Sequence, residues 1–302
     1  MSKNVMLKSL FLMGALLLPL ATAHAEQVVG EISYLTTSYE DTLQDIATKH
    51  DFGFVELVTA NPDVDPWLPG EGVNILMPGR HILPKGKRQG ILVNVGEMRL
   101  YYFNGNGQII NYPIAVGREG KFTPIGETTV RSKKVDPIWY PTASTRKDKP
   151  ELPAMVPAGP DNPLGKHALY LGWNSYLIHG TNKPDGIGRN ASRGCIRMYP
   201  DDVEKLFHTV PIGTHVQVVN QPVKIALIEG EVYVEAHPTQ QQADEIELHD
   251  HFITKQPVEP EIFHEIVQVA GDKASNINWK TLRKVLQERR GYPIMVTGNN
   301  NS

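Results

Sequence analysis

The chain contains one cysteine, Cys195, and a histidine, His179, precedes it in a glycine-rich stretch. A free thiol is mostly protonated at neutral pH, and a nearby imidazole can take its proton or hold the thiolate as an ion pair. The sulfur could then attack a carbonyl carbon, form a thioester and pass the acyl group to a second nucleophile. The competing interpretation is that Cys195 is a small buried hydrophobic residue and His179 a loop histidine without a chemical role.

The N-terminus has the pattern of an export signal. Lys3 and Lys8 precede an apolar run over residues 10–20, and a small-x-small cleavage site ends at Ala25. A transmembrane helix needs about 20 apolar residues. We therefore expect residues 1–25 to be a cleaved signal peptide and the protein to be exported from the cytoplasm, with no membrane span after cleavage. A lone thiol outside the cytoplasm is at risk of oxidation, which favours a functional role for it.

Composition excludes several classes of protein. The 302 residues include 30 Lys+Arg and 33 Asp+Glu, the formal net charge is −3, and 40% of the residues are hydrophobic. These values exclude a wholly disordered chain, a coiled coil and a polytopic membrane protein. A weakly acidic chain gives no electrostatic argument for nucleic acid as a partner. A single cysteine can form neither an internal disulfide nor a thiolate metal cluster.

The first region after the signal covers residues 31–84. A strand, two short helices and a second strand are predicted there, and Asn61-Pro62 ends the second helix. This order resembles a LysM module, a small α+β fold that binds the glycan of peptidoglycan. The residues that carry the resemblance are Asp41-Thr42-Leu43, Ile46-Ala47, Leu57, Asn61-Pro62, Gly70 and Ile75 to Pro78. The alternative is a small packing domain that binds no sugar.

The two remaining regions differ in their patterns. Residues 89–220 have short apolar strands, many glycines and a hairpin signal at 104–107, which predict a mainly β domain. Their Pro-rich segment 136–163 is expected to form a lid or rim. Residues 222–302 begin with a β-hairpin, continue through a polar linker at 238–250 and end in two amphipathic helices. No catalytic pattern is found in this last region, so we assign it a packing or docking role.

The sequence around the cysteine resembles the signature of a known family. His-Gly-Thr at 179–181, followed by Ser-x-Gly-Cys-Ile-Arg at 192–197, is similar to the motif of the L,D-transpeptidases, whose catalytic domain is of the YkuD type. Thr-Pro-x-Gly at 123–126 also matches that family. The resemblance implies a mainly β, YkuD-like β-sandwich over residues 89–220, preceded by the LysM-like module.

The resemblance also implies roles for individual residues. Cys195 would be the acylated nucleophile, His179 the proton donor and acceptor, and the backbone carbonyl of Gly180 would orient the imidazole. Many family members carry a second histidine where this chain has Arg193, so His179 would perform every proton transfer. Arg193 would instead favour the thiolate or bind a substrate carboxylate, and Arg197 is expected to face the same carboxylates.

Three further expectations concern the surroundings of the thiol. The amides of Gly194 and Cys195 are candidate oxyanion donors, and Ser192 completes the substrate-binding set. Arg189 is a candidate third member of a cationic rim, with a solvated loop arginine as the equal alternative. No metal site is expected, because the histidines at 249 and 251 have no third ligand at a suitable spacing.

Taken together, the resemblances imply a periplasmic cysteine L,D-transpeptidase that acts on peptidoglycan tetrapeptide stems. It would release D-Ala and pass the acyl group to an amine. The expected amine is the C-terminal Lys of an outer-membrane lipoprotein, because Arg193 and the LysM-like region are similar to the branch that attaches a Braun-type lipoprotein. No cofactor is expected, since the thioester conserves the energy of the amide bond. The alternatives are 3–3 cross-linking, hydrolysis by an amidase of the same fold, and wall binding without catalysis.

Overall fold

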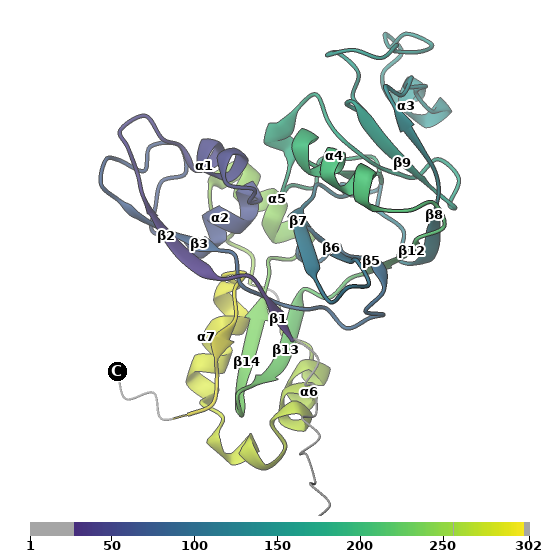
Figure 1. The fold of residues 1–302 in the computed structure, drawn as a ribbon. Helices are drawn as coiled ribbons and strands as arrows, with labels where there is room; N and C mark the ends of the chain where they lie inside the picture. Colours follow the sequence, from purple (N-terminus) through teal and green to yellow (C-terminus); the bar gives the residue numbers. More distant parts are fainter. Residues whose placement is uncertain (1–26, 256, 299–302) are drawn as a thin grey trace, which may run out of the picture.

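The computed structural model describes residues 27–255 and 257–298, and the expected signal peptide 1–25 lies outside the described residues. Figure 1 shows an N-terminal unit beside a large curled sheet, with a C-terminal unit below both. Within the described ranges, no helix is long and apolar enough to cross a membrane.

The N-terminal unit has the strand–helix–helix–strand order expected from the sequence. It consists of β2 (Ile32–Thr36), α1 (Leu43–Lys49), α2 (Phe54–Ala60) and β3 (Asn74–Pro78), and β2 pairs with β3 antiparallel. The Thr42 hydroxyl caps α1 by accepting from the amide of Asp45, and Asn61 ends α2. Two short strands, β1 (Val28–Val29) and β4 (His81–Ile82), pair where this unit meets the rest of the chain. The identity of the unit as a LysM module stays a prediction.

The central unit is built on one eight-stranded sheet. Its strands in spatial order are β11 (Ile196–Arg197), β10 (Leu177–His179), β9 (His167–Leu171), β8 (Gly126–Val135), β12 (His215–Val219), β5 (Gly90–Asn94), β6 (Arg99–Phe103) and β7 (Ile109–Pro113). Two helices accompany the sheet, α3 (Ala143–Asp148) and α4 (Pro200–Thr209).

This continuous sheet differs from the expected β-sandwich, in which two separate sheets would face each other. The long strand β8 is the reason, because its first half pairs with β12 and its second half with β9. The partner changes after Thr129, and a register shift between Val130 and Ser132 follows directly, within the pairing with β9. Such an irregularity lets a strand bend, so a single sheet curls around its own core. Because α-helices occur in all three units, the chain as a whole is mixed α/β rather than mainly β.

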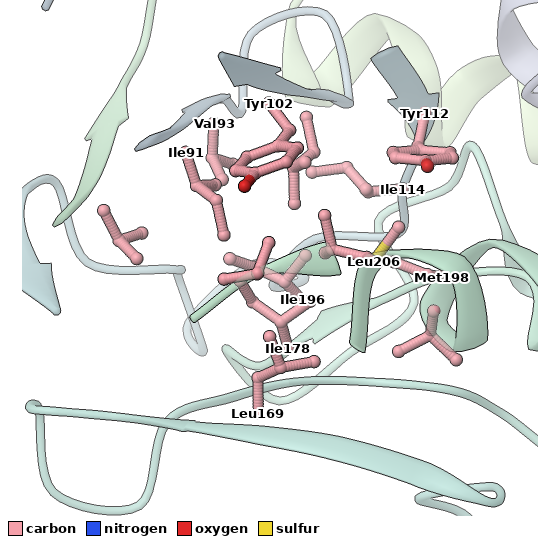
Figure 2. Packing of buried hydrophobic residues seen from close by; sticks show 14 of the residues in the cluster. Ile91, Val93, Tyr102, Tyr112, Ile114, Leu169, Ile178, Ile196, Met198 and Leu206 are labelled. Atoms are coloured by element: carbon pink, nitrogen blue, oxygen red, sulfur yellow. The ribbon is translucent and has the colours of Figure 1, made fainter. Parts of the chain in front are cut away.

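The core of the curled sheet joins its two ends. Figure 2 shows Ile91 of β5 and Tyr102 of β6 in the same cluster as Ile178 of β10 and Ile196 of β11, with Leu206 of α4 packed alongside. These side chains are almost completely removed from solvent. Burial of each large apolar side chain is worth roughly 1.5–3 kcal/mol. Packing against β5, β6 and α4 therefore holds β10 and β11 in place.

The C-terminal unit contains the expected hairpin, β13 (Val223–Ile228) and β14 (Glu231–Ala236), to which β15 (Ile294–Met295) adds a third strand. The two expected helices are α6 (Pro260–Ala270) and α7 (Trp279–Glu288), and the side chain of Asn278 caps α7 as predicted. They pack with the hairpin into one hydrophobic cluster.

The polar segment 238–250 is a helix and not the predicted linker. This helix, α5 (Gln240–His249), begins with a capping box between Thr239 and Gln242. Ala243 and Ile246 are buried in the hydrophobic cluster of the N-terminal unit. Because only two apolar side chains face that cluster, the segment has no clear helical periodicity in its sequence.

A buried cluster of charged side chains, the junction cluster, connects the three units. It comprises Glu56, His81, Glu97, Arg99, Lys224, Glu235 and His237, all nine-tenths or more buried. Arg99 of β6 donates to the carboxylate of Glu56 on α2 at 3.0 and 3.1 Å. Lys224 on β13 contacts Glu97 and lies 2.8 Å from Glu235 on β14. Each charge therefore has a partner of opposite sign, as burial requires.

Removal of the buried ammonium tests this account of the junction. Lys224→Met leaves Glu97 and Glu235 buried without their cation, and we expect the free energy of unfolding to fall by about 3–5 kcal/mol. Urea unfolding measures the change. The matched control is Lys85→Met, which removes the exposed pair with Glu265 and is expected to cost at most about 1 kcal/mol. Equal, small losses in both variants would contradict the account.

Candidate active site

The pairing of β10 with β11 brings together the two residues singled out by the sequence. The strands run parallel, with Ile178 opposite Ile196 and His179 opposite Arg197. Neighbouring side chains on a strand point to opposite faces. Ile178 and Ile196 are 0% and 1% exposed in the core, so His179, Cys195 and Arg197 lie on the other face.

That other face forms the floor of a cavity of about 700 Å³. Five residues of the predicted site line it, namely His179, Ser192, Arg193, Cys195 and Arg197. The expected lid 136–163 contributes further lining residues, which are Ile138, Trp139, Tyr140, Thr142, Ser144, Thr145 and Pro163. The cavity therefore has the thiol and imidazole on one wall and a loop that contains α3 on another.

The imidazole of His179 is held in one orientation by the backbone. Its Nδ1 lies 2.6 Å from the carbonyl oxygen of Gly180, the contact expected from the sequence. A carbonyl only accepts hydrogen bonds, so Nδ1 carries the proton and Nε2 is left as the basic atom. Burial, reinforced by the nearby Arg197 charge, lowers the pKa of His179 to about 4, although the carbonyls of Gly180 and Leu164 oppose this shift. The ring is therefore neutral at neutral pH.

The thiol of Cys195 is also neutral in this state. Its Sγ donates a hydrogen bond to the carbonyl oxygen of Ser175, which lies 3.5 Å away. Although the residue is partly exposed, burial raises the pKa of the thiol above its ordinary value, and the Leu177 amide and Arg197 only partly oppose this. A neutral thiol and a neutral imidazole that line the same cavity are thus favoured over the thiolate–imidazolium pair, the other state that the sequence left open.

Gly194 is required by both conformation and space. Its φ is +108°, a value that favours glycine, and a Cβ at this position would lie 2.9 Å from a ring carbon of Tyr176. Its amide, expected to be an oxyanion donor, donates instead to Oγ of Ser192 at 3.0 Å. Ser192 in turn donates to the carbonyl of Cys195 at 2.5 Å. Ser192 therefore shapes the turn that presents the thiol, and the Gly194 amide is occupied.

The two arginines of the motif have different environments. Arg197 donates to the carbonyl of Ala191 at 3.2 Å, and its buried Nε has no hydrogen-bond partner among residues 27–255 and 257–298. Arg193 is more exposed and pairs with Asp148, at the end of α3, at 2.6 Å. The pKa of Asp148 is lowered, mainly by its hydrogen bond with Arg193. Asp148 could not be predicted as this partner from the sequence, apart from its place in the expected lid.

Arg189 is not part of a cationic rim. Its guanidinium lies 3.7 Å from the ring centroid of Phe54 and donates to Gln44 at 2.8 Å. It therefore connects the motif loop to α1 and α2 of the N-terminal unit. Among the described residues, the two groups of three or more side chains that are spaced for a metal ion lie outside the cavity.

Comparison with known proteins identifies the family of the chain. The family pattern of the YkuD-type L,D-transpeptidase catalytic domain matches residues 88–225. The chain is 38% identical over 281 residues to the probable L,D-transpeptidase ErfK/SrfK of Salmonella typhimurium, covering 90% of this chain and 88% of that protein. It is 42% identical over 228 residues to the probable L,D-transpeptidase YbiS of Escherichia coli, covering 72% of this chain and 74% of that protein.

A solved structure is also similar to part of the chain. The Ldtfm–avibactam carbamoyl enzyme is 23% identical, covers 45% of this chain and 50% of its own, and superposes with a TM-score of 0.37. The sequence relatives extend much further, through regions on both sides of the catalytic domain. On their identity and coverage, the chain belongs to the L,D-transpeptidases of the YkuD type, a family of cysteine transpeptidases.

Proposed function

We propose that this protein is a periplasmic L,D-transpeptidase that acylates Cys195 with peptidoglycan tetrapeptide stems and transfers the acyl group to an amine. The observation that carries the proposal is the common face of β10 and β11, on which His179, Cys195 and Arg197 line one cavity. The hydrogen bond from Nδ1 to Gly180 supports it, because it leaves Nε2 of His179 as a base. Family membership supports the reaction type.

Acylation starts from the neutral pair. Nε2 of His179 takes the thiol proton while Sγ of Cys195 attacks the carbonyl carbon of diaminopimelate in the stem. The C–S bond forms and the carbonyl electron pair moves onto oxygen, near the positive charge of Arg197. When that pair returns, the C–N bond to D-Ala breaks and His179 gives its proton to the leaving amine. The thiol proton thus ends on D-Ala.

Deacylation repeats these steps in reverse with a new amine. The acceptor nitrogen attacks the thioester carbon, and His179 takes up a proton from that nitrogen. The C–S bond breaks, and the sulfur recovers the proton from His179. A bound amine must reach the thioester before water does, so the exclusion of water by the lid determines whether transfer or hydrolysis results.

The cations next to the nucleophile suit an anionic stem peptide. Arg193 pairs with Asp148 on an exposed edge of the cavity, where a substrate carboxylate can replace that partner. A guanidinium binds a carboxylate through two parallel hydrogen bonds, which a lysine could not do. We therefore assign substrate binding to Arg193 and Arg197, whereas Ser192, whose hydroxyl is engaged with Gly194 and Cys195, would support them by shaping the turn.

The acceptor that we propose is the C-terminal Lys of an outer-membrane lipoprotein. The N-terminal unit, proposed to be a LysM module over residues 31–84, would hold the glycan while residues 89–220 act on the stem. Its strand–helix–helix–strand order and its contacts with the motif loop through Arg189 support this arrangement. Residues 222–302 would hold the other two regions together, and a cleaved signal peptide over 1–25 would deliver the protein to the periplasm.

Covalent labelling tests the nucleophile. The purified protein is mixed with ertapenem, a carbapenem whose strained carbonyl reacts with nucleophilic thiols, and its intact mass is measured. We expect one adduct on wild type and none on Cys195→Ala. His179→Gln should be acylated about 10²–10⁴ times more slowly, because the general base is lost. An adduct that persists in Cys195→Ala would overturn the assignment.

Product analysis tests the acceptor. The protein is incubated with tetrapeptide muropeptides and a peptide ending in Lys, and products are followed by mass spectrometry. We expect D-Ala release and a product in which the stem is joined to the peptide through the lysine side chain. A matched peptide ending in Arg has no such amine and should give no conjugate. Tripeptide alone would show a hydrolase, and stem dimers alone would show a 3–3 cross-linking enzyme.

The pH profile of acylation tests the neutral pair. His179 is the base only when it is deprotonated, and its pKa of about 4 should keep the ertapenem acylation rate nearly constant from pH 7 down to about pH 5. An ordinary histidine with a pKa near 6.5 would lose about tenfold by pH 5.5. Circular dichroism at each pH verifies that the protein stays folded. A midpoint between pH 6 and 7 would contradict the assignment.

A further inference from the structure

Two histidines and a glutamate meet where α4 packs against β9, on a part of the protein that the reaction does not use. His167 is the first residue of β9, and Glu204 and His208 belong to α4. One ligand atom from each of the three side chains lies within 4.8 Å of the others. Figure 1 shows α4 lying along the β9 side of the curled sheet.

The secondary structure accounts for this arrangement. Glu204 and His208 are four residues apart on α4, a spacing that puts two side chains on the same face of a helix. The imidazole rings of His167 and His208 lie 5.7 Å apart between centroids, in an edge-to-face arrangement. Phe207 stacks against His167 at 4.9 Å and keeps it in place. Two elements that are packed together thus supply all three ligands.

His167 lacks the hydrogen bonds expected of a buried imidazole. The residue is 3% exposed, and its buried Nδ1 has no hydrogen-bond partner in the part of the chain that the structure describes. Buried polar atoms nearly always have a hydrogen-bond partner, so Nδ1 of His167 is expected to bind a ligand or a water molecule. Glu204 and His208 are exposed, so an ion can reach the group from solvent.

We propose that His167, Glu204 and His208 bind a divalent transition metal ion of the zinc type. Two imidazole nitrogens and a carboxylate oxygen are ligands that Zn²⁺ prefers, whereas Mg²⁺ and Ca²⁺ prefer oxygen alone. Three protein ligands and the exposed position leave at least one coordination place for water.

The other group with metal-ligand composition, within the junction cluster, is already occupied by a cation. His81, Glu97, Glu235 and His237 also lie within 4.8 Å of one another. The ammonium of Lys224 contacts both carboxylates, and all five residues are shielded from solvent. A metal there would have to displace a buried lysine. The group on α4 and β9 has no such internal cation among its three members.

A bound ion would connect α4 to the strand that supports the catalytic histidine. The carbonyl of His167 accepts from the amide of Gly180 at 3.1 Å, and the carbonyl of Gly180 holds Nδ1 of His179. Fixing His167 to α4 would stabilise the folded protein, because a ligand that binds only the native state raises stability. The ion would be structural and would not touch the substrate, since none of its three ligands lines the catalytic cavity.

Isothermal titration of the full protein with ZnCl₂ tests the site. We expect one saturable Zn²⁺ per chain, and a rise of a few degrees in Tm at saturating zinc. Affinity should fall at least about tenfold in His208→Ala and in Glu204→Gln, since loss of even an outer partner of a metal site costs about that much. The matched control is His249→Ala, which removes an exposed histidine at the end of α5 and should bind like wild type.

Three results would overturn the proposal. One is an absence of binding to wild type, and another is equal affinity in wild type and His208→Ala. The third is binding that disappears in Cys195→Ala but persists in His208→Ala, because the ion would then sit on the catalytic thiol. Binding that is retained in Cys195→Ala and lost in His208→Ala supports the site. None of these outcomes depends on which acceptor the enzyme uses.

Discussion

The parallel register of β10 and β11 is the constraint on which the site depends. A slip of β10 by one residue would turn Ile178 out of the core and His179 into it. The cost of exposing one large apolar side chain, roughly 1.5–3 kcal/mol, opposes that slip. The position of the thiol is therefore determined by hydrophobic packing on the opposite face of the sheet, from β5, β6 and α4.

Burial has a chemical effect as well as a structural one. The same low exposure that fixes His179 lowers its pKa to about 4, and burial raises the pKa of Cys195. Both shifts favour uncharged forms, so the thiol of the resting enzyme is protonated and not a thiolate. Reactivity then has to arise when a substrate excludes water and brings its carbonyl to the sulfur. In the mechanism that we propose, Arg197, whose charge acts on both groups, supplies positive charge at that moment.

Much of the site was predictable because its residues are close in sequence. The motif singled out Cys195 and His179, which line one cavity, and the family resemblance implied the contact of the ring with the carbonyl of Gly180. What could not be predicted depended on contacts between distant segments. The helix α5 was missed because only Ala243 and Ile246 are buried on the N-terminal unit. The hydrogen bond that occupies the Gly194 amide depends on the orientation of the Ser192 side chain. The curl of the sheet is associated with the register shift in β8.

The junction cluster limits how far this protein can be treated as a series of separable modules. A cut near residue 84 would remove Glu56 from Arg99, and a cut near 221 would remove Lys224 from Glu97. Either cut would expose charged side chains that are buried and paired in the intact protein. Recombination with other modules would then require replacing the charged residues on both sides of the cut together. The three regions are thus expected to be inherited as one unit.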